Sequence, residues 1–210
     1  MKTIVICDED PAIDLAVAAA ALTQGKLVAV PTETVYGLAA NGLNCEAVER
    51  VYDIKGRPAI KPLSLLVPNI KAAETLCGAV PDGALALAEA FWPGPLTIVL
   101  HRLGNVPDIV TAGGDTVGLR CPDHPKTIEL LRLAGVPAAA PSANPSGMPS
   151  PKTAEEVLEY FDGMIEYIVD GGRCRLGTES TIIDLTVSPP KIIRQGALAE
   201  IEIREVLNKC

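Results

Sequence analysis

The sequence contains few aromatic residues and no long apolar run. Aromatic residues make up 3% of the 210 residues, so the core must consist mainly of Ala, Val, Ile and Leu. No apolar run reaches the roughly 18 residues that a membrane span needs. The N-terminal stretch MKTIVICDEDP meets acidic residues too early for a signal peptide. We therefore expect a cytoplasmic protein that does not enter a membrane.

Sequence patterns of metal sites are missing as well. The six cysteines lie more than thirty residues apart, none forms a C-x-x-C pair, and there are only two histidines. A zinc site needs closely spaced cysteines or histidines. The spacing instead favours reduced thiols, which are usual in cytosolic proteins. It predicts that no metal ion is held by the protein's own side chains.

Motifs of common nucleotide-binding and hydrolytic sites are absent too. The chain has no G-x-x-x-x-G-K-[ST], no G-x-G-x-x-G after a strand and no G-x-S-x-G. The formal net charge of −8 argues against a general nucleic-acid-binding protein, because such proteins usually have a basic surface. A cationic cleft is still compatible with an acidic protein, since the local field depends on the local arrangement of charges.

Residues 31–67 contrast with this acidic background. PTETVYG places Thr32 directly after an apolar run, and KGRPAIK brings Lys55, Arg57 and Lys61 within seven residues without an acid. Asn44 predicts the start of a helix between these segments, and Gly56 predicts its end. A cationic cluster in an acidic chain indicates a site for an anion.

Apolar runs and helix signals alternate irregularly, with no long linker, repeat or low-complexity tract. This pattern predicts one α/β domain over residues 1–210, with a twisted mixed parallel/antiparallel sheet flanked by helices. Asp10 before Pro11, and Asp123 with Pro125, predict two of the helix starts. We expect strands at 3–7, 26–30, 63–67, 96–100, 117–120, 136–140, 167–170, 181–185 and 191–194. We expect helices at 10–22, 45–55, 69–76, 82–91, 123–135, from 153, and at 199–208.

Polar and cationic residues lie at the ends of the apolar strands. The loop PSANPSG contains Ser142 and Asn144, and GTESTIID contains Ser180 where a strand begins. Arg120 and Arg194 each follow apolar residues. Each group alone has an ordinary interpretation as a surface turn or a structural ion pair. Together they lie where open α/β sheets bind ligands, and hydroxyls combined with cations suit a phosphorylated or carboxylated ligand.

Seven segments of the chain follow one another in the order of a known family. PTETVYGLA, KGRP followed by PLSLLV, PGPLT, VGLRCP, PSANPSGMPSP, ESTIIDL and IIRQG resemble the YrdC/Sua5 family of threonylcarbamoyl-AMP synthases over nearly the whole chain. The K-x-R…S-x-N pattern of that family matches Lys55, Arg57, Ser142 and Asn144. Gln195 is a departure, because the family commonly has proline there. The chain is similar to the short, single-domain form of the family.

The resemblance implies a concave, positively charged cleft and a nucleotidyltransferase activity. Such an enzyme forms threonylcarbamoyl-AMP and pyrophosphate from L-threonine, bicarbonate (or CO2) and ATP, and Mg2+ enters with the ATP. The product feeds tRNA processing, namely the synthesis of N6-threonylcarbamoyladenosine (t6A) at adenosine 37. Partner proteins of the t6A machinery normally carry out the transfer to tRNA.

The resemblance also implies the roles of individual residues. Lys55 and Arg57 would be catalytic. Threonine would be bound by Thr32, Ser64, Arg120, Ala140 and Ser180. ATP would be bound by Lys55, Ala59, Thr116, Ser142, Asn144, Ser150 and Arg194.

Three alternatives stay open. Related carbamoyl-adenylate chemistry occurs in the YrdC-like domain of hydrogenase maturation proteins, whose acylphosphatase and zinc-finger modules this sequence does not show. A YciO-type protein fits the KGRP segment poorly. A non-catalytic double-stranded RNA-binding module would use the cleft for its charge; the net charge of −8 argues against it, although a focused cleft would still bind RNA weakly.

Overall fold

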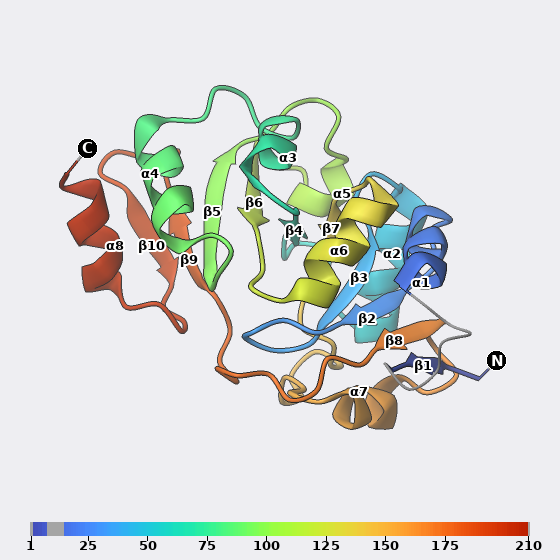
Figure 1. Ribbon diagram of the computed structural model, residues 1–210. Coiled ribbons are helices and arrows are strands. Elements are labelled where there is room, and N and C mark those ends of the chain that lie inside the picture. Colours follow the sequence, from blue (N-terminus) through green and yellow to red (C-terminus); the bar gives the residue numbers. More distant parts are fainter. Residues whose placement is uncertain (1, 8–14, 210) are drawn as a thin grey trace.

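The computed structural model describes residues 2–7 and 15–209, in which ten strands form one sheet (Figure 1). The strands are β1 Ile4–Ile6, β2 Val28–Val30, β3 Gly37–Asn41, β4 Ser64–Leu66, β5 Leu96–His101, β6 Thr116–Arg120, β7 Ala138–Ala139, β8 Tyr167–Val169, β9 Thr181–Asp184 and β10 Lys191–Arg194. Their order in the sheet is β1-β8-β2-β3-β7-β4-β6-β5-β9-β10. Because β4–β6 and β5–β9 are parallel while β3–β7 and β5–β6 are antiparallel, the predicted mixed α/β sheet is confirmed.

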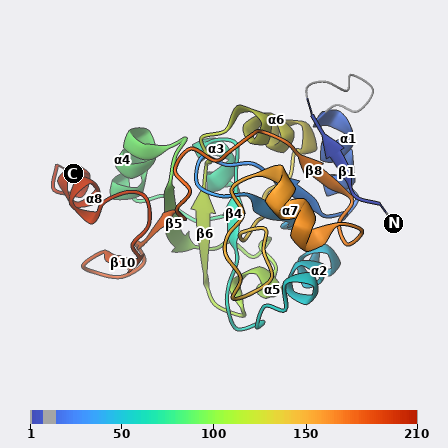
Figure 2. The same cartoon turned by 90° about the horizontal axis from the view of Figure 1, so that it is seen from below.

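Helices flank the sheet on both faces. They are α1 Leu15–Thr23, α2 Cys45–Lys55, α3 Ile70–Glu74, α4 Asp82–Phe91, α5 Asp108–Thr111, α6 Pro125–Ala134, α7 Ala154–Phe161 and α8 Glu200–Leu207. Figure 2 shows α1 and α6 on one side of the sheet and α2 and α5 on the other. In the described residues, no helix combines the length and the apolar character needed to cross a membrane.

Two apolar cores lie on the two faces of the sheet. In β2, Val28 and Val30 contact the core beneath α1 and α6, whereas Ala29 belongs to the larger core that includes α2, α4 and α7. In β4, Leu65 and Leu66 divide in the same way. Successive side chains of a strand point to opposite faces, so even a short strand contributes side chains to both cores. The strands from which the polar loops extend are therefore packed against apolar side chains on both faces of the sheet.

Helix α2 forms as its sequence signals predict. The side chain of Asn44 accepts a hydrogen bond from the backbone N–H of Ala47 at 3.2 Å, which satisfies one free donor at the helix start. Gly56 ends the helix with φ 58°, in the left-handed region where glycine is favoured. The chain then turns into the KGRPAIK loop, so these two caps fix where the loop begins.

Some elements differ from the prediction. Strand β3 and the short helix α5 are additional. Strand β7 spans Ala138–Ala139 alone, and α6 starts at Pro125 with His124 as its N-cap instead of Asp123. The predicted start at Asp10 and Pro11 lies outside the described residues. β3 has the composition Gly-Leu-Ala-Ala-Asn, which has weak strand propensity; it becomes a strand because β2 and β7 pair with it.

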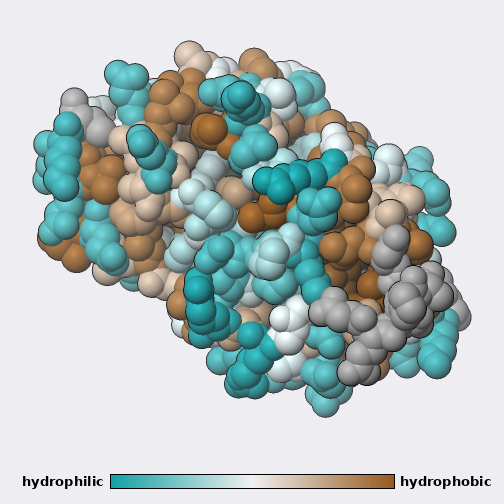
Figure 3. Space-filling model, viewed as in Figure 1, coloured by the Kyte–Doolittle hydropathy of each residue, from teal (hydrophilic) through white to brown (hydrophobic). Residues whose placement is uncertain are grey.

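Hydrophobic side chains also reach the surface at one end of the molecule. Leu85 of α4, Ile193 of β10 and Ile201 of α8 are exposed. Figure 3 shows brown surface among hydrophilic residues at the side where these elements lie. Strand β10 forms one edge of the sheet, and β1 forms the opposite edge.

Candidate functional site

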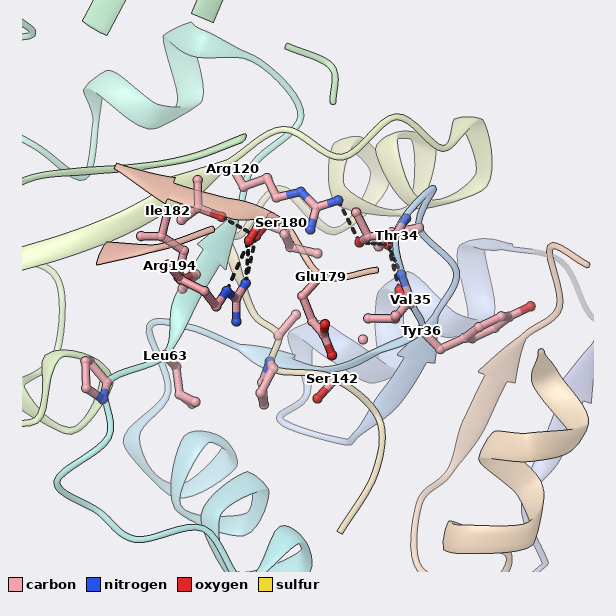
Figure 4. Close-up of a pocket in the computed structure, with 18 of the residues that line it drawn as sticks. Thr34, Val35, Tyr36, Leu63, Arg120, Ser142, Glu179, Ser180, Ile182 and Arg194 are labelled. Carbon is pink, nitrogen blue, oxygen red and sulfur yellow. Dashed lines mark hydrogen bonds between the residues drawn. The ribbon is translucent and has the colours of Figure 1, made fainter. Parts of the chain in front are cut away.

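A cavity opens where loops and strand ends from distant parts of the sequence meet (Figure 4). Its volume is about 160 Å³, below the roughly 300–1,000 Å³ of pockets for drug-sized ligands, so a nucleotide would extend beyond it. The lining residues are Thr32, Thr34, Val35, Tyr36, Gly37, Arg57, Pro62, Leu63, Ser64, Leu66, Thr97, Arg120, Ala140, Pro141, Ser142, Glu179, Ser180, Ile182 and Arg194.

Arg120, the last residue of β6, is buried and forms an ion pair with buried Glu33. Its Nη2 donates to Glu33 Oε1 at 2.7 Å and to Thr34 Oγ1 at 2.9 Å, and its Nε donates to the carbonyl of Gly94 at 3.1 Å. Glu33 Oε2 accepts a further bond from the backbone N–H of Asp123 at 3.0 Å. Among the described residues, Nη1 of Arg120 has no hydrogen-bond partner, which leaves one donor edge of a fixed guanidinium for a ligand.

The turn after β2 is held by its own hydroxyl groups. Thr32 Oγ1 accepts bonds from the backbone N–H groups of Thr34 and Val35 at 3.1 and 3.2 Å, and it lies 2.6 Å from the carbonyl oxygen of Val35. The hydroxyls of Thr32 and Thr34 are 2.7 Å apart. Thr32 and Thr34 are both buried, so the turn presents a rigid polar edge to the cavity next to Arg120.

The start of β9 and the end of β10 bring a second arginine to the cavity. Arg194 donates from Nε and Nη2 to the carbonyl of Ser180 at 3.1 and 2.8 Å, and from Nη2 to Ser180 Oγ at 3.0 Å. Ser180 Oγ also lies 2.8 Å from Thr97 Oγ1 of β5. Burial lowers the pKa of Arg194; Glu179 raises it, while the nearby cations Arg120 and Arg57 lower it further. Arg120 and Arg57 therefore lie close enough for their charges to act on Arg194.

The KGRPAIK loop supplies the third arginine. Arg57 Nε donates to the carbonyl of Lys61 at 3.2 Å and Nη2 to that of Pro62 at 2.9 Å, so the side chain folds back over its own loop. Burial lowers the pKa of Arg57. Within the described ranges, the guanidinium is held on the cavity wall by backbone groups and by no carboxylate, which leaves its charge available to an anion.

Lys55 lies beneath the 141–151 loop and does not line the cavity. Its side chain is buried, and Nζ donates to the carbonyls of Ser142 and Asn144, both at 2.5 Å. The backbone carbonyl of Lys55 also accepts a bond from Ser146 N–H at 2.7 Å. Burial, with a further contribution from Arg57, lowers the pKa of Lys55 to about 8. In this arrangement Lys55 ties helix α2 to the loop.

Asn144 and Ser150 hold the same loop in shape. Asn144 Nδ2 donates to the carbonyls of Pro145 and Met148 at 2.9 and 2.7 Å, while its buried Oδ1 has no partner among the described residues. Ser150 Oγ donates to Glu179 Oε1 at 2.6 Å. The loop is thus joined to the start of β9 through a cavity-lining carboxylate.

The cavity gathers eight of the residues that the sequence singled out: Thr32, Arg57, Ser64, Arg120, Ala140, Ser142, Ser180 and Arg194. Five others are not on its wall. Lys55 and Asn144 are buried under the loop, Ser150 reaches the site through Glu179, Ala59 is exposed after α2, and Thr116 lies at the opposite end of β6 from Arg120.

The sequence interpretation assigned no ligand role to Thr34, Thr97 and Glu179 on the wall or to Glu33 behind it. Glu33 and Glu179 stand in segments that were already singled out, PTETVYG and GTESTIID, so the signal was an acid beside the chosen hydroxyls. In the described part of the chain, no group of three or more His, Cys, Asp or Glu side chains could hold a metal ion.

The chain that forms this cavity is similar to known proteins. The model of the Sua5/YciO/YrdC family, described as telomere recombination, matches residues 20–196. The chain belongs to this family. It is 49% identical over 193 residues to the threonylcarbamoyl-AMP synthase of Pyrococcus abyssi, covering 92% of this chain and 57% of the relative.

One further relative and one solved structure are also similar to the chain. The threonylcarbamoyl-AMP synthase of Bacillus subtilis is 45% identical over 199 residues, which cover 94% of this chain and 57% of the relative. The structure of P. abyssi Sua5 complexed with L-threonine superimposes with a TM-score of 0.90 at 46% identity, covering 98% of this chain and 60% of that one. The chain thus spans somewhat more than half the length of these relatives.

Proposed function

We propose that this protein is an L-threonylcarbamoyladenylate synthase, a nucleotidyltransferase that converts L-threonine, bicarbonate (or CO2) and ATP into threonylcarbamoyl-AMP and pyrophosphate. The observation that carries the proposal is the convergence of Arg57, Arg120 and Arg194, from three distant segments, on one cavity with serine and threonine hydroxyls. The names of the relatives, and the complex of P. abyssi Sua5 with L-threonine, support the same activity.

The inner part of the cavity suits the amino acid. Arg120 Nη1 offers a charge-assisted hydrogen bond to the threonine carboxylate, and its position is fixed by Glu33. Thr32 and Ser180 line the cavity beside it and are proposed to contact threonine, although both hydroxyls are already hydrogen-bonded within the protein. Ser64 and Ala140 complete the proposed threonine site. An amino acid is small enough for the volume of about 160 Å³.

The mouth of the cavity suits the nucleotide. Arg57 and Arg194 lie on its wall and would bind phosphate oxygens, together with Ser142. The remaining residues proposed for ATP are Lys55, Ala59, Thr116, Asn144 and Ser150. Lys55, proposed as catalytic with Arg57, would exchange its bonds to the loop carbonyls for the triphosphate, so ATP binding and the 141–151 loop would be coupled.

Charge neutralisation accounts for the chemistry. The threonine amine adds to CO2 and forms a carbamate; a carbamate oxygen attacks the α-phosphorus, and the bond to pyrophosphate breaks. Both reactants are anions that repel each other, so guanidinium groups that align them lower the barrier without a covalent nucleophile. The part of the chain that the structure describes offers no carboxylate cluster for Mg2+, which we propose enters as part of the ATP substrate.

The cellular role follows from the product. We propose that threonylcarbamoyl-AMP feeds t6A formation at adenosine 37 of tRNA in the cytoplasm, through partner proteins that perform the transfer. The positive charge proposed for the cleft would also allow weak binding of RNA, which depends strongly on salt.

A pyrophosphate-release assay tests the proposal. The protein is supplied with ATP, bicarbonate and one amino acid at a time, and we expect release with L-threonine that falls when bicarbonate is removed. Arg57→Ala and Lys55→Ala should nearly abolish turnover in folded protein, and Arg120→Ala should weaken threonine binding measured by calorimetry. Turnover with carbamoyl phosphate in place of threonine would favour carbamoyl-adenylate chemistry. Salt-sensitive binding of double-stranded RNA without any turnover would favour the RNA-binding alternative.

A further inference from the structure

Glu179 is the only acidic residue among the described residues that line the cavity. Its carboxylate accepts a hydrogen bond from Ser150 Oγ at 2.6 Å, and it forms no ion pair within the described residues. Figure 4 shows the side chain of Glu179 extending into the cavity toward Ser142. An acid is thus placed in a space that is otherwise lined by hydroxyls, apolar groups and three arginines.

A carboxylate in this place disfavours negatively charged groups of a ligand in its immediate vicinity. Two like charges about 4 Å apart near a protein surface repel each other by several kcal/mol. The other acid near the cavity, Glu33, is behind the wall and neutralised by Arg120 at 2.7 Å. Glu179 has no such cation within ion-pair distance in the described residues; Arg194 and Lys152 act on it only from further away, so its carboxylate can pair directly with a cationic group of a ligand.

We infer that Glu179 binds the ammonium group of the amino-acid substrate while Arg120 binds its carboxylate. The inference rests on the proposed function and adds to it the residue that recognises the amino group of the substrate. The two ends of an α-amino acid carry opposite charges, and the cavity offers Arg120 Nη1 for one end and the Glu179 carboxylate for the other. A carboxylic acid without the amine would leave Glu179 unpaired.

The ionisation of Glu179 agrees with this role. The hydrogen bond from Ser150 lowers the pKa of Glu179, against the opposing effect of burial, and Arg194 and Lys152 lower it further. The side chain is therefore a carboxylate at neutral pH. Ser150 also fixes one of its oxygens, so the orientation of the acid is set before the ligand arrives.

The test compares two ligands by calorimetry in the absence of ATP: L-threonine and 3-hydroxybutanoate, which is threonine without its amino group. The unchanged protein should bind L-threonine much more tightly. Glu179→Gln keeps the size and the bond to Ser150 but removes the charge, and it should weaken L-threonine binding by roughly ten- to a hundredfold. Binding of 3-hydroxybutanoate should stay equal or become tighter, so that the preference for the amine is largely lost.

Two control variants show whether the effect belongs to the charge at position 179. Glu159→Gln and Glu205→Gln each remove an equal charge from an exposed position, on α7 and on α8 respectively. Both should keep the preference for L-threonine. If Glu179→Gln keeps it too, or if only MgATP binding weakens in that variant, the inference is wrong while the proposed function stands. If the unchanged protein does not bind L-threonine at all, the proposed function and this inference both fail.

Discussion

Glu33 and Arg120 form a buried pair whose energetics can be tested at a single residue. Both side chains are almost fully buried, and Glu33 also accepts the backbone N–H of Asp123. Glu33→Gln would keep the shape and leave the arginine charge uncompensated. Breaking a buried pair from one side destabilises a protein by about 3–5 kcal/mol. Because glutamine keeps a hydrogen bond, we expect a loss of about 2–4 kcal/mol in the free energy of unfolding, measured with urea.

The control for this substitution is Glu159→Gln, because Glu159 is an exposed glutamate of α7. Exposed positions without such contacts change the free energy of unfolding by about 0.5 kcal/mol or less. A loss below about 1 kcal/mol for Glu33→Gln would show that the ion pair is not a major support of the fold.

The lowered pKa of buried Lys55 predicts that the free energy of unfolding depends on pH. Burial lowers its pKa to about 8, whereas the unfolded chain has the ordinary value of 10.5. Between these values the unfolded state binds a proton that the folded state does not, so the free energy of unfolding rises with pH across this window. Below about 8 both states are protonated and the full penalty of burying the ammonium is present.

The measurement compares the wild type with Lys55→Met, since tyrosines and thiols also titrate in this range and cancel in the difference. From pH 8 to about pH 10, stability of the wild type relative to the variant should increase by about 2 kcal/mol in urea unfolding. A relative stability that stays constant or falls would mean that Lys55 keeps its charge when buried.

At the scale of one element, the end of α2 determines where the KGRPAIK loop starts. Gly56 has φ 58°, and a Cβ there would meet nothing within 4 Å, so a substitution tests the backbone conformation alone. A residue with a Cβ loses about 1–2 kcal/mol in the left-handed region. Gly56→Ala should lower the free energy of unfolding by about 1 kcal/mol.

Gly104→Ala is the matched control, because the space around Gly104 is also open and its φ is not positive. Equal effects of the two substitutions on the free energy of unfolding would show that the left-handed conformation is not the cause.

Signals within a few residues predicted helix α2 well, but such signals could not predict pairings between segments that are distant in the sequence. Asn44 and Gly56 are caps whose chemistry acts within four residues, so the sequence alone places α2. Strand β3 depends on partners at both sides, one of them about a hundred residues away, and its own composition favours no strand. The Arg120–Glu33 pair likewise joins residues 87 positions apart. The ordered sequence motifs contain most of the residues that line the cavity. The roles of Glu33 and Glu179, the acids that orient these residues, could be recognised only from their contacts in the structure.

At the scale of the whole molecule, one sheet separates two cores. Leu22 of α1 is buried in the core beneath α1 and α6, whereas Trp92, the single tryptophan, packs against the larger core. If residues 1–210 are one domain, as the sequence predicts, damage to one core must destabilise the other through the shared strands. Trp92 fluorescence and far-UV circular dichroism should then report the same transition.

Leu22→Ala makes this coupling measurable. A buried leucine replaced by alanine lowers stability by about 2–5 kcal/mol, which for a chain of this size lowers Tm by about 4–20 °C. We expect Trp92 fluorescence, which probes the other core, to shift by the same amount as the circular dichroism signal. A Trp92 transition that stays at its original temperature while the dichroism signal splits would show two units that unfold independently. One shared transition means that the arginines of β6 and β10 and the loops after β2 and β7 are fixed relative to one another by a single cooperative sheet, as a cavity assembled from all of them requires.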